Sequence, residues 1–173
     1  QVHYSVHNEL NIDLVLFLNG IPAATAELKT DFTQSIEDAV DQYRFDRIPK
    51  PKGQNPEPLL TFSSGALVHF AVSSSEVKMT TRLAGPRTNF LPFNQGDAGA
   101  AGNPTNPDGY KTAYLWEQVW QRDSWLDILG RYLTAERDDK KNIKTLIFPR
   151  FHQLDVTRQL LATVRHEGPG HKY

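Results

Sequence analysis

The stretch Asn11-Ile-Asp-Leu-Val-Leu-Phe-Leu-Asn-Gly-Ile-Pro-Ala-Ala-Thr-Ala-Glu-Leu-Lys29 decides the fold expected for this chain. Two runs of strand-forming residues flank Asn19-Gly20, a dipeptide typical of tight hairpin turns. The sequence therefore predicts a β-hairpin that carries two carboxylates, Asp13 and Glu27, and the ammonium group of Lys29.

The register of this hairpin decides whether the three charged groups meet. Residues two apart share one face of a strand, so Glu27 and Lys29 point the same way. A strict two-residue loop would place Asp13 on the opposite face. A three-residue loop, or one bulge, sets Asp13 directly across from Glu27, and Pro22 favours such an irregularity because it cannot donate to the ladder. We therefore predict an odd loop or a bulge.

These residue types suit the hydrolysis of a phosphodiester. Carboxylate oxygens are the ligands that Mg²⁺ prefers, and the ion polarises the phosphate and activates water. A nearby ammonium group stabilises the negative charge that develops. The sequence thus predicts a metal-dependent nuclease in which Asp13, Glu27 and Lys29 are catalytic, with Mg²⁺ as the cofactor and Mn²⁺ as an alternative ion.

A helix is expected after the hairpin. Asp31 can cap it, with Gln34 three residues later in a capping-box arrangement. Its apolar residues follow a helical stripe that must pack on a sheet: Phe32, Ile36, Ala39, Val40 and Tyr43. Gln42 lies at the edge of this stripe, where its amide either reaches the metal site or its phosphate, or stays on the surface.

The rest of the chain reads as one α/β domain with a C-terminal extension. Strands are expected at 59–63, 66–72 and 77–83, a long loop at 94–109 with no binding function, and helices over 113–133. We assign residues 1–134 to a nuclease domain, 135–146 to a charged linker and 147–173 to a C-terminal helical segment.

Composition limits the possible classes. A chain of 173 residues with 39% apolar content can bury one core. It has no cysteine, which excludes disulfides and cysteine-based zinc or thiol chemistry. No apolar run reaches the length of a membrane span and no secretory leader is visible, so we expect a cytoplasmic protein. Because it begins at Gln1, we expect a piece of a longer polypeptide.

The net charge of −1 argues against a general electrostatic grip on DNA. A local cluster of basic residues follows the predicted helix: Arg44, Arg47, Lys50 and Lys52. These side chains are candidates for phosphate contacts, and a solvated basic face is the alternative.

Seven stretches in order along the chain are similar to one known family. They are Asp13-Leu-Val-Leu-Phe-Leu-Asn-Gly-Ile-Pro22, Ala26-Glu-Leu-Lys29, Ala66-Leu-Val-His-Phe-Ala71, Met79-Thr-Thr-Arg-Leu-Ala-Gly85, Phe90-Leu-Pro-Phe-Asn94, Trp120-Gln-Arg-Asp-Ser-Trp-Leu-Asp-Ile-Leu129 and Ile147-Phe-Pro-Arg-Phe-His-Gln153. The chain resembles the N-terminal endonuclease domain of the restriction (R) subunit of type I restriction-modification enzymes.

The resemblance implies a PD-(D/E)xK (restriction-endonuclease-like) core, a mixed β-sheet flanked by helices. It implies that Asp13 and Glu27 bind Mg²⁺, that the backbone carbonyl of Leu28 is a further ligand, and that Lys29 assists attack by water. The family's Gln-x-x-x-Tyr helix motif is matched at Gln42. Position 46 is Asp rather than Tyr, and Tyr43 cannot replace it at the same helical angle.

The resemblance extends to partners and to nucleotide binding. The segment 148–158 looks like the adenine-reading segment that precedes the motor domain of superfamily 2 helicases, with Gln153 as its glutamine. No Gly-x-x-x-x-Gly-Lys-Ser/Thr loop is present, so ATP hydrolysis and translocation are expected only in the full-length subunit. The implied partners are double-stranded DNA, cut when it is unmodified and foreign, and the modification and specificity subunits.

Two other functions remain open from the sequence. A non-catalytic docking module could keep the fold and brace a larger DNA-processing assembly, although a scaffold has no need to hold two carboxylates together against their mutual repulsion. A structure-selective DNA repair nuclease could use the same core, which the matching stretches beyond the hairpin disfavour.

Overall fold

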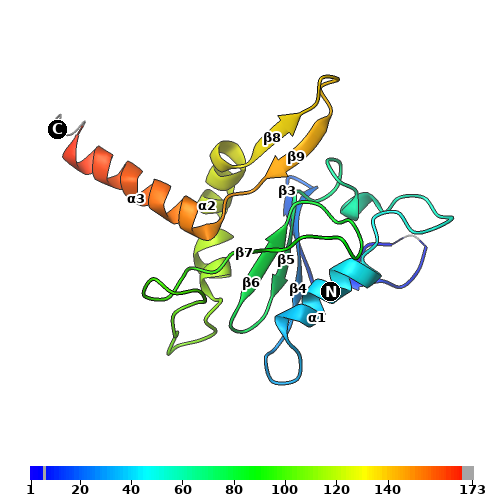
Figure 1. The fold of residues 1–173 in the computed structure, drawn as a ribbon, viewed down its shortest axis with the longest axis horizontal. Helices are drawn as coiled ribbons and strands as arrows, with labels where there is room; N and C mark the ends of the chain where they lie inside the picture. The colour runs from blue at the N-terminus through cyan, green and yellow to red at the C-terminus, as the bar shows by residue number, and fades with distance from the viewer. Residues whose placement is uncertain (6, 169–173) are drawn as a thin grey trace.

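A five-stranded mixed sheet organises the fold (Figure 1). The computed structural model describes residues 1–5 and 7–168, so residue 6 and residues 169–173, which end the predicted C-terminal segment, lie outside the described residues. The parallel pair β4 and β5 lies at the centre of the sheet, and the other neighbours are antiparallel. The strands in spatial order are β3 (Leu14–Leu18), β4 (Ile21–Leu28), β5 (Val68–Val72), β6 (Val77–Thr80) and β7 (Leu91–Pro92). The sheet confirms the α/β class expected from the sequence.

The predicted irregularity in the β3–β4 hairpin is present as a bulge. Both turn residues, Asn19 and Gly20, have positive φ, which is the geometry of a two-residue hairpin turn. The register then shifts between Leu16 and Phe17, which leaves Ala23 unpaired on β4. Beyond the bulge Leu14 pairs with Ala26, so Asp13 precedes β3 on the same side of the ladder as Glu27, which follows Ala26.

The two faces of the sheet pack against different partners. One face carries Phe70 at the centre of an aromatic cluster formed with Phe93, Trp120 and Phe148. The helical segments that cover this face are η3 (Leu115–Val119), α2 (Arg122–Asp127) and η4 (Ile128–Tyr132). The opposite face is covered by α1 (Ile36–Asp41) and its continuation η1 (Gln42–Asp46), a π-helical turn. This second face carries the charged residues of the hairpin.

The helix after the hairpin begins later than the sequence predicted. Ser35 is the N-cap of α1, and the Asp38 carboxylate accepts hydrogen bonds from both the amide and the hydroxyl of Ser35. The predicted cap at Asp31 and capping box with Gln34 are therefore wrong, and Phe32 is 90% exposed. A charged carboxylate at the third helical position forms stronger hydrogen bonds than the amide of Gln34 would, which favours the later start. The remaining apolar stripe is buried as expected.

The C-terminal third contains a β-hairpin where the sequence predicted a linker. Residues 135–146, predicted as a linker, lie within a hairpin of β8 (Thr134–Arg137) and β9 (Ile143–Ile147). Phe148 after it packs into the core of the sheet, and α3 (Phe151–Glu167) then extends away from the rest of the molecule (Figure 1). None of the described helices is both long and apolar enough to cross a membrane.

Three short elements complete the fold. Residues 59–63, predicted as a strand, begin in the 3₁₀-helix η2 (Pro58–Leu60), because proline is well suited to the first position of a helix. The strands β1 (Val2–His3) and β2 (Asn11–Ile12) pair with each other ahead of the hairpin. Ile12, the last residue of β2, pairs with Val2, and this pairing fixes the backbone immediately before Asp13.

Gly65 closes a tight turn after η2, and replacing it with alanine is expected to destabilise the fold. A Cβ at this position would lie 2.4 Å from the backbone oxygens of both Pro58 and Leu59, which cannot rotate away as side chains can. We expect Gly65→Ala to lower the free energy of unfolding by about 1–3 kcal/mol in urea denaturation. The control is Gly130→Ala, because a Cβ there meets no atom within 4 Å. Equal stability of the two variants would contradict this account.

Candidate active site

The three charged residues of the predicted site lie together at the carboxyl end of β4. The Leu28 amide donates a hydrogen bond to Asp13 Oδ2 over 2.9 Å, which fixes the Asp13 carboxylate beside the strand that carries Glu27. Burial raises the pKa of Asp13, but hydrogen bonds from Leu28 and Gln1, the interaction with Glu27 and the charge of Lys29 outweigh it, so this pKa is lowered. Asp13 is therefore a carboxylate at neutral pH.

Glu27 is the most deeply buried member of the site, with 1% of its surface exposed. Its Oε1 accepts a hydrogen bond from Arg47 Nε over 2.6 Å, in a buried ion pair. Burial raises the pKa of Glu27 to about 7, Arg47 opposes this rise, and the negative charge of Asp13 adds to it. The two neighbouring carboxyls thus differ in their readiness to ionise, as two acids sharing one site do.

Arg47 corrects one of the expectations from the sequence. It was predicted on a basic DNA-binding surface, but its side chain is buried against Glu27 and its guanidinium lies 5.9 Å from the centre of the Tyr4 ring. Its role is therefore internal. Sequence reasoning missed it as a member of the site.

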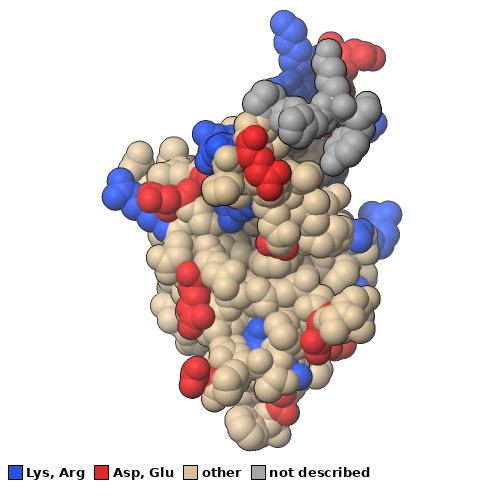
Figure 2. Space-filling view, turned by 90° about the vertical axis from the view of Figure 1, so that its left-hand side faces the viewer, with Lys and Arg blue, Asp and Glu red and all other residues tan. Residues whose placement is uncertain are grey.

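The other basic residues of that set divide in two. Arg44 is half-buried, where it donates to the Thr88 carbonyl and pairs with Asp41 at 3.5 Å. Lys50 and Lys52 are exposed, which fits phosphate contacts and a solvated basic face equally. Figure 2 shows the side of the molecule where α3 ends, and there basic and acidic side chains are intermixed without a continuous basic surface. DNA contacts by these residues stay a prediction.

The π-helical turn η1 explains how Arg47 reaches Glu27. The Arg47 amide donates to the Gln42 carbonyl over 2.9 Å, a bond from residue i+5 to residue i. This turn aligns Arg47 with Gln42, where a regular α-helix would align Asp46. Asp46 is exposed, so the position of the family's tyrosine carries no buried side chain here.

A buried hydrogen-bonded chain holds η1 against the sheet beneath the site. The Tyr43 hydroxyl and Thr25 Oγ1 are 2.8 Å apart, and Thr25 Oγ1 is 2.8 Å from His69 Nδ1. Burial lowers the pKa of His69 to about 3, so this imidazole is neutral. Thr25 shares its strand face with Glu27, and the chain thereby fixes the distance between β4 and the turn that carries Arg47.

Gln42 lies in a cleft beside Lys29, and its amide oxygen is buried. It lines a cleft of about 340 Å³ that Lys29 and Asp46 also line. Its Oε1 is buried and has no hydrogen-bond partner among the residues the structure describes. The structure therefore brings Gln42 and Lys29 to one cleft.

The donor set fits a magnesium ion held with few protein ligands. Across residues 1–5 and 7–168, no cluster of three or more His, Cys, Asp or Glu side chains could hold a metal. The site instead offers the Asp13 and Glu27 carboxylates together with the Leu28 backbone at the exposed end of β4. Mg²⁺ is commonly bound through one or two carboxylates, with water and substrate phosphate completing its shell.

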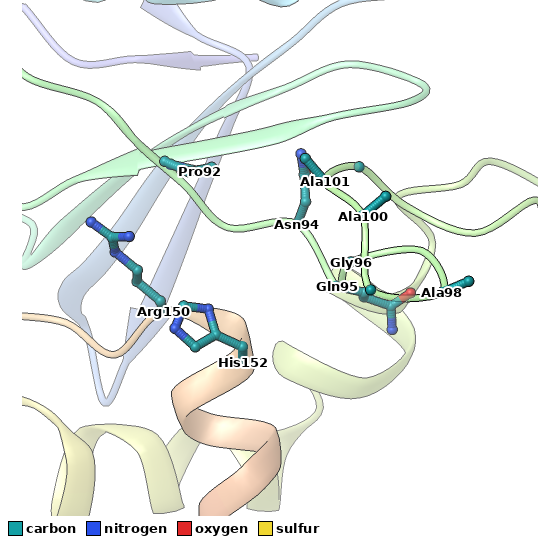
Figure 3. Close-up of a pocket in the computed structure, with 11 residues that line it drawn as sticks. Pro92, Asn94, Gln95, Gly96, Ala98, Ala100, Ala101, Arg150 and His152 are labelled. Carbon is teal, nitrogen blue, oxygen red and sulfur yellow. The ribbon is translucent and has the colours of Figure 1, made fainter.

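Gln153 lies far along the chain from this site, in the first turn of α3. Its Oε1 accepts a hydrogen bond from the Arg150 amide over 3.0 Å and so caps the helix. A cleft of about 530 Å³ has Arg150 and His152 on one side and the 94–102 loop on the other (Figure 3), and Gln153 is not among the residues that line it. Recognition of adenine by Gln153 stays a prediction.

Comparison with known proteins identifies the family. Residues 1–88 match the family described as Type I restriction enzyme R protein N terminus. The chain belongs to this family. No curated protein matches it, and no solved structure does. Within this R-protein N terminus the matched residues include the whole Asp13, Glu27 and Lys29 group, whereas Gln153 lies beyond them.

Proposed function

We propose that this chain is the Mg²⁺-dependent endonuclease domain of a type I restriction enzyme R subunit, with a PD-(D/E)xK core. The substrate would be double-stranded DNA and the reaction phosphodiester hydrolysis. The observation that supports this most is the meeting of Asp13, Glu27 and Lys29 across a bulged hairpin. Membership of the R-protein N-terminal family supports the same function.

Each residue has a part in this proposal. Asp13 and Glu27, with the Leu28 carbonyl, would hold the ion, which when bound polarises the phosphate and eases ionisation of water. The Lys29 ammonium would neutralise the charge that develops on the phosphate oxygens. Gln42 would orient the phosphate or water through its buried, unpartnered amide oxygen and its amide nitrogen.

The partners and the energy source belong to the larger enzyme. We propose that ATP-driven translocation by a motor domain of the full-length subunit delivers unmodified DNA to this site. The modification and specificity subunits would supply sequence recognition. The net charge of −1 supports this division, because a domain that gripped DNA alone would be strongly basic.

The metal site can be tested without turnover, by calorimetric titration with Mg²⁺ or Mn²⁺. We expect the wild-type chain to bind the ion, and Asp13→Ala to weaken binding by at least about 100-fold, since outer-shell substitutions alone weaken metal sites by 10- to 100-fold. Asp139→Ala is the matched control, because Asp139 is exposed in the turn between β8 and β9. Unchanged affinity in Asp13→Ala would favour the docking module over the nuclease.

A further inference from the structure

A second pocket opens at the same end of the sheet as the candidate active site. It has a volume of about 210 Å³ and is lined by three segments: residues 28–30 at the end of β4, residues 72–74 at the end of β5, and residues 110–116 ahead of and within η3. The ends of neighbouring parallel strands are where ligands bind in sheets of this class. The volume is below the range of 300–1,000 Å³ for drug-sized ligands and suits a single small ring system.

Two aromatic side chains give this pocket its shape. Tyr110 is 52% exposed and Trp116 is 39% exposed, although both are large and apolar. Their ring centres are 6.4 Å apart and their planes meet at 78°, so the two rings form an edge-to-face corner. Thr112 holds this segment to the sheet, because its hydroxyl donates to the Ser73 carbonyl over 2.8 Å. The corner is therefore built into the fold.

The pocket adjoins the residues that would cut DNA. Leu28 and Lys29 line it, one and two residues after Glu27, which corresponds to about 7 Å of strand. Lys29 also lines the cleft that contains Gln42, so this residue lies between the two surfaces. Among the described residues, none that lines the pocket is acidic, and Lys29 is a basic member of the lining. An aromatic pocket beside a basic residue suits a polyanionic ligand that carries flat rings.

We propose that Tyr110 and Trp116 bind one unpaired nucleobase of the DNA strand, one or two nucleotides from the phosphate held by Lys29. This inference rests on the proposed function and names how the same site holds its substrate. A base presents a π-face to an aromatic side chain whatever its identity, so the pocket reads no sequence. It selects instead for DNA whose bases are already unstacked, because extracting a base from an intact duplex costs a few kcal/mol.

The test compares two oligomers of equal length, oligo(dT) and an abasic oligodeoxynucleotide, which differ only in the bases. Binding is followed by fluorescence anisotropy in EDTA. We expect the wild-type chain to bind oligo(dT) more tightly than the abasic oligomer. Trp116→Ala and Tyr110→Ala should each lower the affinity for oligo(dT) by roughly 5- to 100-fold, the range for losing one base–aromatic stack, and leave the abasic oligomer unaffected. Trp116→Phe and Tyr110→Phe should keep most of the affinity.

The matched control is Phe17→Ala, which removes an equally exposed aromatic side chain on β3. It should leave both affinities unchanged. Equal affinity of the wild type for the two oligomers, or alanine variants that weaken both equally, would overturn the inference. Because the titration contains no divalent ion, its result is independent of the metal site. If the protein binds Mg²⁺ but binds oligo(dT) and the abasic oligomer equally, only the nucleobase pocket is rejected. If it prefers oligo(dT) but binds no metal ion, only the nuclease is rejected.

Discussion

Replacing Glu27 with glutamine is expected to abolish the conversion of supercoiled plasmid to open circles in Mg²⁺. The substitution keeps the shape of the side chain and removes one of the two carboxylates proposed to hold the ion, Asp13 and Glu27. A bound ion contributes several kcal/mol of charge stabilisation, so the rate should fall by roughly a thousandfold. The control is Glu136→Gln, an exposed residue on β8. Equal nicking by the wild type and Glu27→Gln would show that Glu27 has no catalytic part.

The same residue makes metal binding depend on pH in a stated direction. The pKa of Glu27 is raised to about 7 in the metal-free protein, and a metal ligand must lose its proton. Below pH 7 the affinity for Mn²⁺ or Mg²⁺ should therefore fall by about tenfold per pH unit, and above pH 7 it should level off. Calorimetric titrations between pH 5.5 and 8 measure this, and an affinity that is constant below pH 7 would contradict it.

The sequence predicted the hairpin well because its constraint is local. Asn19-Gly20 specifies the turn, and the alternation of side chains then requires one irregularity for Asp13 and Glu27 to share a face. The structure has that irregularity as a bulge at Ala23. Side chains along a strand always alternate between the two faces of the sheet. The requirement that Asp13 and Glu27 share a face therefore decides the register of the hairpin.

Arg47 could not be found in the same way. Its pairing with Glu27 spans twenty residues and depends on the π-helical turn η1. Helical periodicity aligns Gln42 with Asp46, and one inserted residue in the turn replaces Asp46 by Arg47. One signal was available, since the Gln-x-x-x-Tyr motif implied by the resemblance has an exposed Asp46 in place of its tyrosine here. Where a helical motif lacks its expected residue, the next residue along the chain can take that place through a π-helical turn.

Local capping signals misled the prediction where two competed. Asp31 and Ser35 are both good caps, and the second is selected by the hydrogen bonds from Ser35 to Asp38 together with the packing of Ile36 and Ala39 against β5. The charged 135–146 segment reads as a linker by composition, yet β8 and β9 pair through their backbones, which composition does not report. Both errors arise where long-range contacts decide between local alternatives.

Replacing Arg47 with methionine is expected to cause the largest loss of stability among the residues of the site. Methionine keeps much of the aliphatic volume but removes the guanidinium that pairs with Glu27 at 2.6 Å. Removing one partner of a buried ion pair typically lowers the free energy of unfolding by about 3–5 kcal/mol, because the other charge is left uncompensated. Urea denaturation of the metal-free protein at pH 8 measures this loss, and Arg137→Met on the exposed strand β8 is the control.

The loss should be smaller at pH 5.5, because Glu27 can take up a proton there. The folded-state pKa of Glu27, about 7, lies above its ordinary value of 4.5, so the native protein binds more protons than the unfolded chain between these values. The stability that Glu27 contributes is therefore complete below pH 4.5 and is lost as pH rises through 7. Without Arg47 the pKa of Glu27 rises further, so the decline in stability continues above pH 7 instead of levelling off there. In the background of Glu27→Gln, Arg47→Met should cost the same at both pH values, since no titrating carboxyl remains opposite it. A loss below about 1 kcal/mol, or an equal loss at pH 5.5 and 8 with Glu27 present, would mean that Arg47 does not hold the Glu27 carboxylate in its charged form.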